Sequence, residues 1–223
     1  MKNIAVIPAY NEAGTIRRVI REALQQVDEV IVVNDGSVDN TAVLAQAAGA
    51  FVVSHPHNLG KGAALNTGLQ TAASLKAEIV TILDADKQHD PAEIPLLADK
   101  LIRDKLDMVI GSRYLQKNDI PVYRCLGLFV LNMMTNLGSG VCVTDSQSGF
   151  RVFSKKAVQL MCFKERGFSV ESEMQFIAAK YSLKVGEVPI KAFYQGKAKR
   201  NPVVHGFFVL SRIFSLYREY KWL

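Results

Sequence analysis

The feature that most constrains this chain is a short apolar segment that ends in two carboxylates. Residues 79–83 are mostly β-branched and apolar, which is typical of a buried strand. Asp84 and Asp86 follow directly, separated by one alanine. Residues 90–93 then combine an N-cap aspartate, a proline and a glutamate at capping-box spacing, which predicts the start of a helix. The two carboxylates are therefore predicted to lie between a strand and a helix.

This position favours a metal and phosphate site. In open α/β sheets, ligands bind beyond the carboxyl ends of the strands. Asp84 and Asp86, with Gln88 as a third oxygen ligand, suit a Mg²⁺ or Mn²⁺ ion that also holds substrate phosphates. A solvated Asp-x-Asp turn is the alternative for these residues taken alone, so the choice depends on the rest of the chain.

Predicted strands and helices alternate through the first half of the sequence. The expected strands are residues 3–8, 29–34, 50–54, 79–83 and 107–112, and the expected helices are residues 15–26, 40–48, 61–75 and 91–103. This alternation is typical of an α/β fold with a mostly parallel sheet and helices on both faces. A chain of 223 residues with 49% hydrophobic and 22% charged residues fits one folded domain, residues 1–223.

A polar loop follows each expected strand, and parallel strands bring such loops to one edge of the sheet. Gly60 and Gly62 allow a ligand to approach the backbone closely, and Lys61 between them supplies a positive charge for a phosphate. Asp35 is placed to accept hydrogen bonds from a base or ribose, although an Asp-Gly pair is also a common turn.

Six sequence motifs, which follow one another along the chain, resemble those of glycosyltransferase family 2, the inverting nucleotide-sugar enzymes of the GT-A fold. They are VIPAYNE, VNDGSVDNT, NLGKGAALNTG, LDADKQHDP, GSRY and DSQSGFRVF, and the resemblance as a whole covers roughly residues 3–200. Within that family, the combination of DADKQH, GSRY and SGFR is most similar to the dolichyl- and polyprenyl-phosphate sugar transferases, of the dolichol-phosphate mannosyltransferase type.

The resemblance implies a role for each matching residue. The residues implied to hold the base and ribose of the donor are Pro8, Tyr10, Glu12, Val33 and Asp35. Those implied to hold its diphosphate and the metal are Lys61, Asp84, Ala85, Asp86, Gln88 and Lys199. Arg113 and Arg124 would face the phosphate of the acceptor. Asp145 would lie beside the reaction centre, so Asp86 and Asp145 are the implied catalytic residues.

The chemistry of sugar transfer agrees with these roles. A departing diphosphate needs its negative charge neutralised, which a divalent ion and basic side chains provide. A lipid phosphate is already anionic near neutral pH and needs no strong general base, whereas a hydroxyl acceptor does. The sequence therefore favours an inverting, metal-dependent enzyme that moves a sugar from a GDP- or UDP-linked donor to a polyprenyl or dolichyl phosphate.

Two other functions stay open at this point. One keeps the same donor site but uses a saccharide or small-molecule hydroxyl as acceptor. The other is a nucleotide-sugar-binding or nucleotidyltransferase-like protein that transfers no sugar. Nucleic acid is not an expected partner, because no nucleic-acid-binding module is recognisable.

The net charge of +6 arises entirely near the end of the chain. Residues 1–190 contain 20 basic and 20 acidic residues, whereas residues 191–223 contain seven basic residues and only Glu219. A basic segment of this kind predicts an anionic partner, such as a diphosphate or a membrane surface. The family motif expected there, an arginine followed by Gly-x-Ser-Lys, is only partly met: Lys199 matches, but Ala198 stands where a serine is expected and the upstream arginine is absent, so Lys197 or Arg200 could substitute.

Membrane contact is a separate question, because two amphipathic segments occur near residues 122–138 and 203–222. The first is too short and the second too charged to span a bilayer. Each could pack on the core, lie at a membrane interface, or contact a second copy or a membrane subunit. Three cysteines without metal or disulfide spacing, and no signal-peptide pattern at the N-terminus, predict a cytoplasmic protein at the inner face of a membrane.

Overall fold

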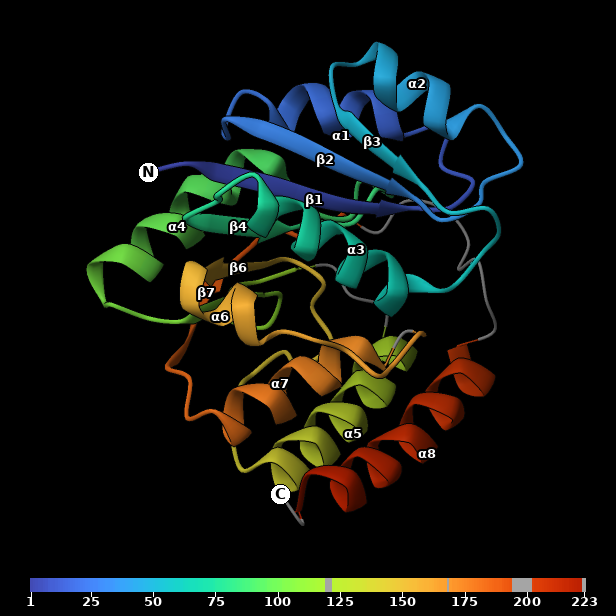
Figure 1. Cartoon of the computed structure of the whole chain (residues 1–223). Coiled ribbons are helices and arrows are strands. Elements are labelled where there is room, and N and C mark those ends of the chain that lie inside the picture. Colours follow the sequence, from blue (N-terminus) through green and yellow to red (C-terminus); the bar gives the residue numbers. More distant parts are fainter. Residues whose placement is uncertain (119–121, 168, 194–201, 222–223) are drawn as a thin grey trace.

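The centre of the molecule is a seven-stranded sheet with the order β3-β2-β1-β4-β6-β5-β7 (Figure 1). The computed structural model describes residues 1–118, 122–167, 169–193 and 202–221, and only the backbone of residues 122–124, 126, 202–207 and 221. The strands are β1 (Asn3–Ala9), β2 (Glu29–Asn34), β3 (Phe51–Ser54), β4 (Ile79–Ile82), β5 (Met108–Ser112), β6 (Arg151–Ser154) and β7 (Val185–Pro189). Neighbouring strands are parallel except at β6, which runs antiparallel to both β4 and β5. The predicted mostly parallel sheet is confirmed.

Helices cover both faces of this sheet. They are α1 (Ile16–Ala23), α2 (Thr41–Ala47), α3 (Lys61–Ser74), α4 (Ile94–Arg103), α5 (Val122–Ser139), α6 (Lys155–Leu160), α7 (Val170–Lys180) and α8 (Pro202–Lys221). Apolar side chains of α1, α2 and α4 pack on one face, and those of α3, α6 and α7 pack on the other. The α/β class with two covered faces is therefore also confirmed.

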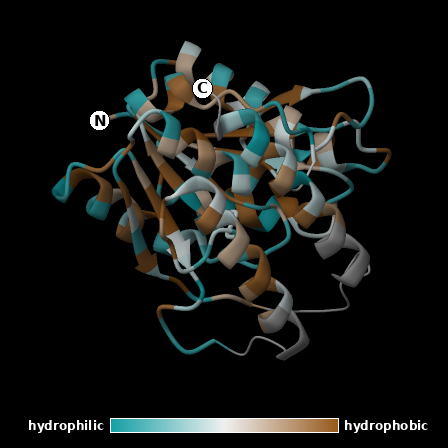
Figure 2. Ribbon diagram, turned by 90° about the horizontal axis from the view of Figure 1, so that it is seen from below, coloured by the Kyte–Doolittle hydropathy of each residue, from teal (hydrophilic) through white to brown (hydrophobic). Residues whose placement is uncertain are grey.

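The strand sequences explain this burial. In β2, Ile31 and Val33 join the core cluster on one face, while Val30 and Val32 join the cluster on the other. Successive side chains of a strand point to opposite faces, so a sheet covered on both sides needs a continuous apolar run. Hydrophobic residues accordingly dominate the central strands, and hydrophilic residues gather in the loops (Figure 2).

The predicted elements of the first half all occur, with boundaries within three residues, but the start of the helix after β4 differs in detail. A 3₁₀ turn (Pro91–Glu93) precedes α4. Asp90 caps this turn by accepting the N–H of Ala92 at 2.9 Å, as predicted. The predicted capping box is wrong, because the Glu93 carboxylate accepts the N–H of Lys191 at 3.0 and 3.2 Å instead. Glu93 thereby joins this turn to the segment after β7.

A second layer of helices lies beyond α7, where α5 and α8 run side by side (Figure 1). Buried apolar residues between the three helices are Leu131, Phe176, Val209, Ile213 and Leu216. Gly138, the last residue of the first predicted amphipathic segment, lies within α5, which continues to Ser139. It permits close packing on α7, because a Cβ there would lie 2.7 Å from Phe176 Cζ, and Gly140, with a φ of +75°, follows the last helical residue. Within the described part of the chain, no helix is long and apolar enough to cross a membrane.

Candidate active site

Lys61 joins three elements at the carboxyl edge of the sheet. Its Nζ lies 2.6 Å from Asp84 Oδ1, directly after β4, and 2.7 Å from Glu171 Oε1 in the first turn of α7. Burial disfavours the ammonium, but the two carboxylates outweigh it, so the pKa of Lys61 is raised and the group stays charged. The predicted phosphate-binding lysine is thus part of a buried ion-pair group.

The second carboxylate of the acidic pair has a different environment. Burial and the negative charge of Asp84 raise the pKa of Asp86. Burial also acts on Asp84, but Lys61 overcomes it and holds the pKa of Asp84 below its usual range. Gln88 donates to Asp86 twice, from its backbone N to Oδ1 at 3.0 Å and from Nε2 to Oδ2 at 2.5 Å. The repulsion between the two carboxylates is one that a bound cation would relieve.

The donor set around this pair fits a divalent ion bound partly by substrate. No group of three His, Cys, Asp or Glu side chains gathers within the described ranges. Mg²⁺ often takes only one or two protein carboxylates and completes its shell with phosphate oxygens and water.

Gly149 forms a wall of this site. A Cβ at position 149 would lie 2.5 Å from Asp84 Oδ2 and 3.1 Å from Lys61 Nζ. The lack of a side chain at position 149 therefore leaves room for Asp84 Oδ2, the carboxylate oxygen that does not pair with Lys61. Only glycine offers that space without displacing one of the two charged groups.

We expect Gly149→Ala to lower transferase activity at least about 100-fold, because the added methyl displaces Asp84 or Lys61 from its position. Turnover and circular dichroism of the purified variant provide the measurement. Gly167→Ala is the matched control, since a Cβ at position 167 meets nothing within 4 Å. Equal activity of the two variants would show that Asp84 need not keep its position.

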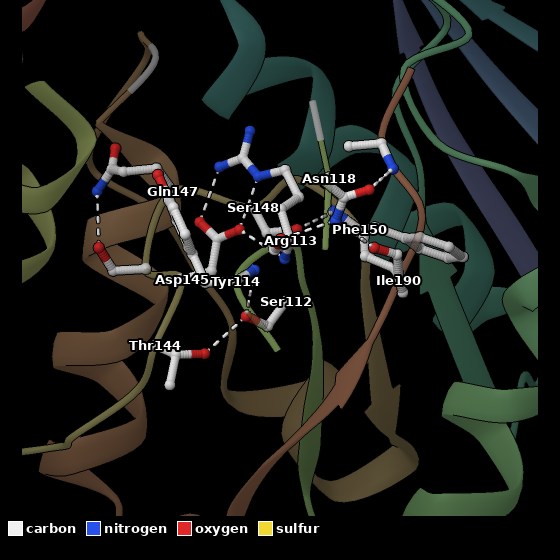
Figure 3. Close-up of polar contacts among 12 residues, drawn as sticks. Ser112, Arg113, Tyr114, Asn118, Thr144, Asp145, Gln147, Ser148, Phe150 and Ile190 are labelled. Atoms are coloured by element: carbon white, nitrogen blue, oxygen red, sulfur yellow. Dashed lines mark hydrogen bonds and ion pairs between the residues drawn. The ribbon is translucent and has the colours of Figure 1, made fainter. Parts of the chain in front are cut away.

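Arg113 and Asp145 form a bidentate pair beyond the end of β5 (Figure 3). Arg113 Nε lies 2.6 Å from Asp145 Oδ2, its Nη2 lies 2.7 Å from Oδ1, and its backbone N donates to Oδ2 at 3.1 Å. Asp145 is only 1% exposed. Burial would raise the pKa of Asp145, but the Arg113 guanidinium holds it below the usual range. The predicted acceptor-binding arginine and the predicted catalytic aspartate are thus brought into direct contact.

Two further side chains hold this pair in place. Glu187 on β7 accepts the backbone N–H of Thr144 at 2.8 Å and that of Asp145 at 3.2 Å. Asn118 donates to the carbonyls of Arg113 at 2.7 Å and Ile190 at 3.0 Å (Figure 3). No sequence pattern predicts these contacts, because they join segments far apart in the chain.

Arg151 is wholly buried at the start of β6. Burial lowers its pKa to about 10, although Glu171, Asp145 and Glu187 act in the opposite direction. Its Nε donates to the carbonyl of Ser148 at 2.9 Å and its Nη2 to that of Ser146 at 2.7 Å. Arg151 thus fixes the loop that carries Asp145 and Gly149, a role that the SGFR motif alone did not reveal.

Asp35 is buried and uses its carboxylate within the protein. It accepts the N–H groups of Leu59 at 2.9 Å and Gly60 at 2.8 Å, and contacts His55 Nδ1 at 2.7 Å. His55 Nε2 lies 2.9 Å from Thr67 Oγ1. This network orders the loop that ends at Lys61. The spacing of His55 in the sequence indicated no partner for it, and contact of Asp35 with a base or ribose stays a prediction.

The other predicted donor residues lie around the ends of β1 and β2. Tyr10 is 45% exposed, Pro8 and Glu12 are half-buried, and Val33 is buried within β2. Ala85 is buried between the two acidic residues. The remaining two predictions concern Arg124, in the first turn of α5, whose side chain lies outside the described residues, and Lys199, which also lies outside them.

Comparison with known proteins shows the family of the chain. The model of the family described as glycosyl transferase family 2 matches residues 4–160. A UDP-N-acetylglucosamine–dolichyl-phosphate N-acetylglucosaminyltransferase of Methanococcus voltae is 34% identical over 236 residues, covering 95% of this chain and 94% of the relative. A dolichol-phosphate mannosyltransferase of Pyrococcus furiosus is 30% identical and covers 100% of this chain and 64% of its own.

A solved structure shares the fold. Glucosyl-3-phosphoglycerate synthase of Mycobacterium tuberculosis, crystallised with Mn²⁺, UDP and phosphoglyceric acid, matches with a TM-score of 0.77 at 22% identity, covering 98% of this chain and 78% of that one. The family match and the shared fold together define the class of this chain, a glycosyltransferase with the GT-A fold. The chain belongs to glycosyl transferase family 2, and the predicted resemblance to dolichyl-phosphate sugar transferases is confirmed by its relatives.

Proposed function

We propose that this enzyme is an inverting, metal-dependent transferase that moves a sugar from a nucleotide-diphosphate donor to a polyprenyl or dolichyl phosphate. The observation that best supports the acceptor is the Arg113–Asp145 pair. Asp145 is buried and neutralised by two bonds from Arg113, so it is poorly suited to remove a proton from a hydroxyl. A phosphate acceptor requires no such step, and the two relatives described above are named for dolichyl or dolichol phosphate.

In this proposal, Asp84, Asp86 and Gln88 hold Mg²⁺ or Mn²⁺ together with the diphosphate of a GDP- or UDP-linked sugar. The metal supplies positive charge to the leaving diphosphate. Lys61 holds Asp84 in position and adds positive charge beside the same group. The base and ribose lie against the ends of β1 and β2, near Tyr10 and Asp35, and Lys199 is the proposed basic residue that binds the diphosphate.

The acceptor phosphate is proposed to lie at the other end of the site. Arg113 and Arg124 reduce the repulsion between the phosphate of the lipid and the diphosphate of the donor. Asp145 orients Arg113 through the bidentate contact, and its own position is fixed by Glu187 and by the loop that Arg151 holds. Asp145 is therefore a positioning residue beside the reaction centre in this mechanism.

Transfer of radiolabel tests the proposal. Purified enzyme is incubated with Mn²⁺, dolichyl phosphate and labelled UDP-N-acetylglucosamine, UDP-glucose or GDP-mannose, and the label is extracted into organic solvent. We expect one donor to give an extractable, metal-dependent product. Label in a water-soluble saccharide would instead support a hydroxyl acceptor, and donor binding without any product would support a binding protein.

The outer helices support a position at the cytoplasmic face of a membrane. Phe129, Met133 and Leu137 recur every four residues of α5 and are 43–71% exposed. Phe214 and Tyr217 on α8 are also exposed, and Tyr217 lies beside Gly138 of α5. Helix α8 belongs to residues 191–223, the part of the sequence with the excess of basic residues. Apolar side chains flanked by basic groups are typical of a helix that binds anionic membranes.

We expect Leu137→Asp to weaken binding to vesicles of phosphatidylcholine and phosphatidylglycerol about tenfold, because a side chain worth roughly 1.5–3 kcal/mol of burial is replaced by a charge. Vesicle flotation measures the bound fraction. Val43→Asp is the control, since Val43 is 66% exposed on α2, at the opposite end of the molecule (Figure 1). Equal binding of both variants, with concentration-dependent dimers in sedimentation, would assign the surface to a second copy instead.

A further inference from the structure

Glu171 has an oxygen that the protein does not satisfy. Its Oε1 pairs with Lys61 Nζ at 2.7 Å, but its Oε2 is buried and has no hydrogen-bond partner within the described residues. The residue as a whole is 4% exposed. Leaving a buried charged oxygen unpaired is costly, and such atoms in native proteins usually await a water, an ion or a ligand.

Comparison with Glu173 shows that a position in the first turn of α7 does not by itself explain the unsatisfied oxygen of Glu171. Glu173 Oε1 accepts the N–H of Lys164 at 3.0 Å and the O–H of Tyr220 at 2.8 Å, and its Oε2 accepts the N–H of Glu165 at 2.9 Å. Both oxygens are therefore used to hold neighbouring segments together. The helix dipole favours a glutamate at either position in the first turn of α7. In the structure, both oxygens of Glu173 accept hydrogen bonds, whereas Oε2 of Glu171 accepts none from the described residues.

The missing partner of Glu171 has to be a cation or a hydrogen-bond donor. A diphosphate offers only anionic acceptors and is repelled by a carboxylate. The sugar attached to it offers O–H groups, and an ionised carboxylate accepts these in strong bonds of about 2.5–2.7 Å. A single ammonium group, that of Lys61, separates Glu171 from Asp84. The sugar of a donor whose diphosphate lies at Asp84 is therefore within reach of Glu171.

We infer that Glu171 recognises the transferred sugar: its Oε2 accepts a hydrogen bond from a hydroxyl or amide N–H of that sugar, while its Oε1 holds Lys61. This inference rests on the proposed function. It makes Glu171 a determinant of sugar specificity, because a donor that lacks the matching group leaves the buried carboxylate unpaired.

Titration calorimetry of Glu171→Gln tests the inference. The ligands are UDP-N-acetylglucosamine, UDP-glucose and GDP-mannose, with UDP and GDP as their sugar-free counterparts, all in the presence of Mn²⁺. We expect the affinity for the preferred nucleotide sugar to fall about tenfold, since a neutral hydrogen bond is roughly half as strong as a charged one. The affinity for the matching nucleoside diphosphate should stay within about twofold. Equal losses for both ligands would mean that Glu171 only positions Lys61, and would overturn the inference.

Glu173→Gln serves as the matched control on the same helix. It should lower the melting temperature, because it weakens three internal hydrogen bonds, and leave the ratio of the two affinities unchanged. If Glu171→Gln does not fold, deoxy analogues of the preferred donor replace it, and one of them must bind wild type about tenfold more weakly. Insensitivity at every position would overturn the inference. A wild type that binds no nucleotide sugar would instead contradict the proposed function itself.

Discussion

Asp86→Asn should abolish sugar transfer while leaving the protein at least as stable as the wild type. The substitution removes one anionic ligand from the proposed metal site, and we expect kcat/KM to fall on the order of 1,000-fold. In the absence of metal, burial and repulsion from Asp84 disfavour the ionised carboxylate of Asp86 and raise its pKa. A neutral amide of the same shape relieves this repulsion, so the melting temperature without metal should not decrease.

Asp84→Asn provides the contrast. Asp84 pairs with Lys61 at 2.6 Å, so its neutralisation should lower both activity and stability, the latter by about 1–3 kcal/mol. Thermal melts with and without Mn²⁺ and GDP or UDP measure stability, and transfer of radiolabelled sugar measures activity. Wild type should gain stability from metal and nucleotide together, and Asp86→Asn should lose that gain. Full activity of Asp86→Asn, or of wild type after exhaustive chelation, would rule out the metal.

The different environments of Asp84 and Asp86 illustrate which features the sequence could predict. The strand ending at Ile82, the carboxylates that follow it and the convergence of the loops all follow from local patterns and from the geometry of parallel strands. That Lys61 would bind Asp84 and leave Asp86 to Gln88 depends on the packing of α3 and α7. No spacing in the sequence contains that information.

Strand β6 explains much of what the sequence could not predict. It is only four residues long, begins with the buried Arg151 and has no strand-like alternation. Because β6 runs antiparallel between β4 and β5, the loop before it lies at the carboxyl ends of both neighbours. That insertion brings Gly149 against Asp84 and Asp145 against Arg113. A prediction from parallel strands alone finds the edge of the sheet but not these partners.

The Arg113–Asp145 contact also changes how the acceptor site has to be tested. Arg113→Ala alone leaves Asp145 as a buried, unpaired charge, which should cost about 3–5 kcal/mol of stability. A loss of activity in that variant would therefore not separate acceptor binding from misfolding. Removing both partners avoids this problem, because the pair is expected to contribute little net stability relative to neutral replacements.

We expect Arg113→Ala/Asp145→Ala to recover most of the stability lost in Arg113→Ala but none of the acceptor binding. Loss of charge-assisted contacts to a lipid phosphate should raise the KM for dolichyl phosphate roughly 30- to 1,000-fold, equivalent to about 2–4 kcal/mol, while the affinity for the nucleotide sugar stays near that of wild type. Arg113→Lys should retain only part of the acceptor binding, since an ammonium cannot pair with Asp145 through two bonds and contact the phosphate as well. If the double variant instead loses donor affinity and keeps its dependence on dolichyl phosphate, Arg113 belongs to the donor side, and a hydroxyl acceptor becomes the better hypothesis.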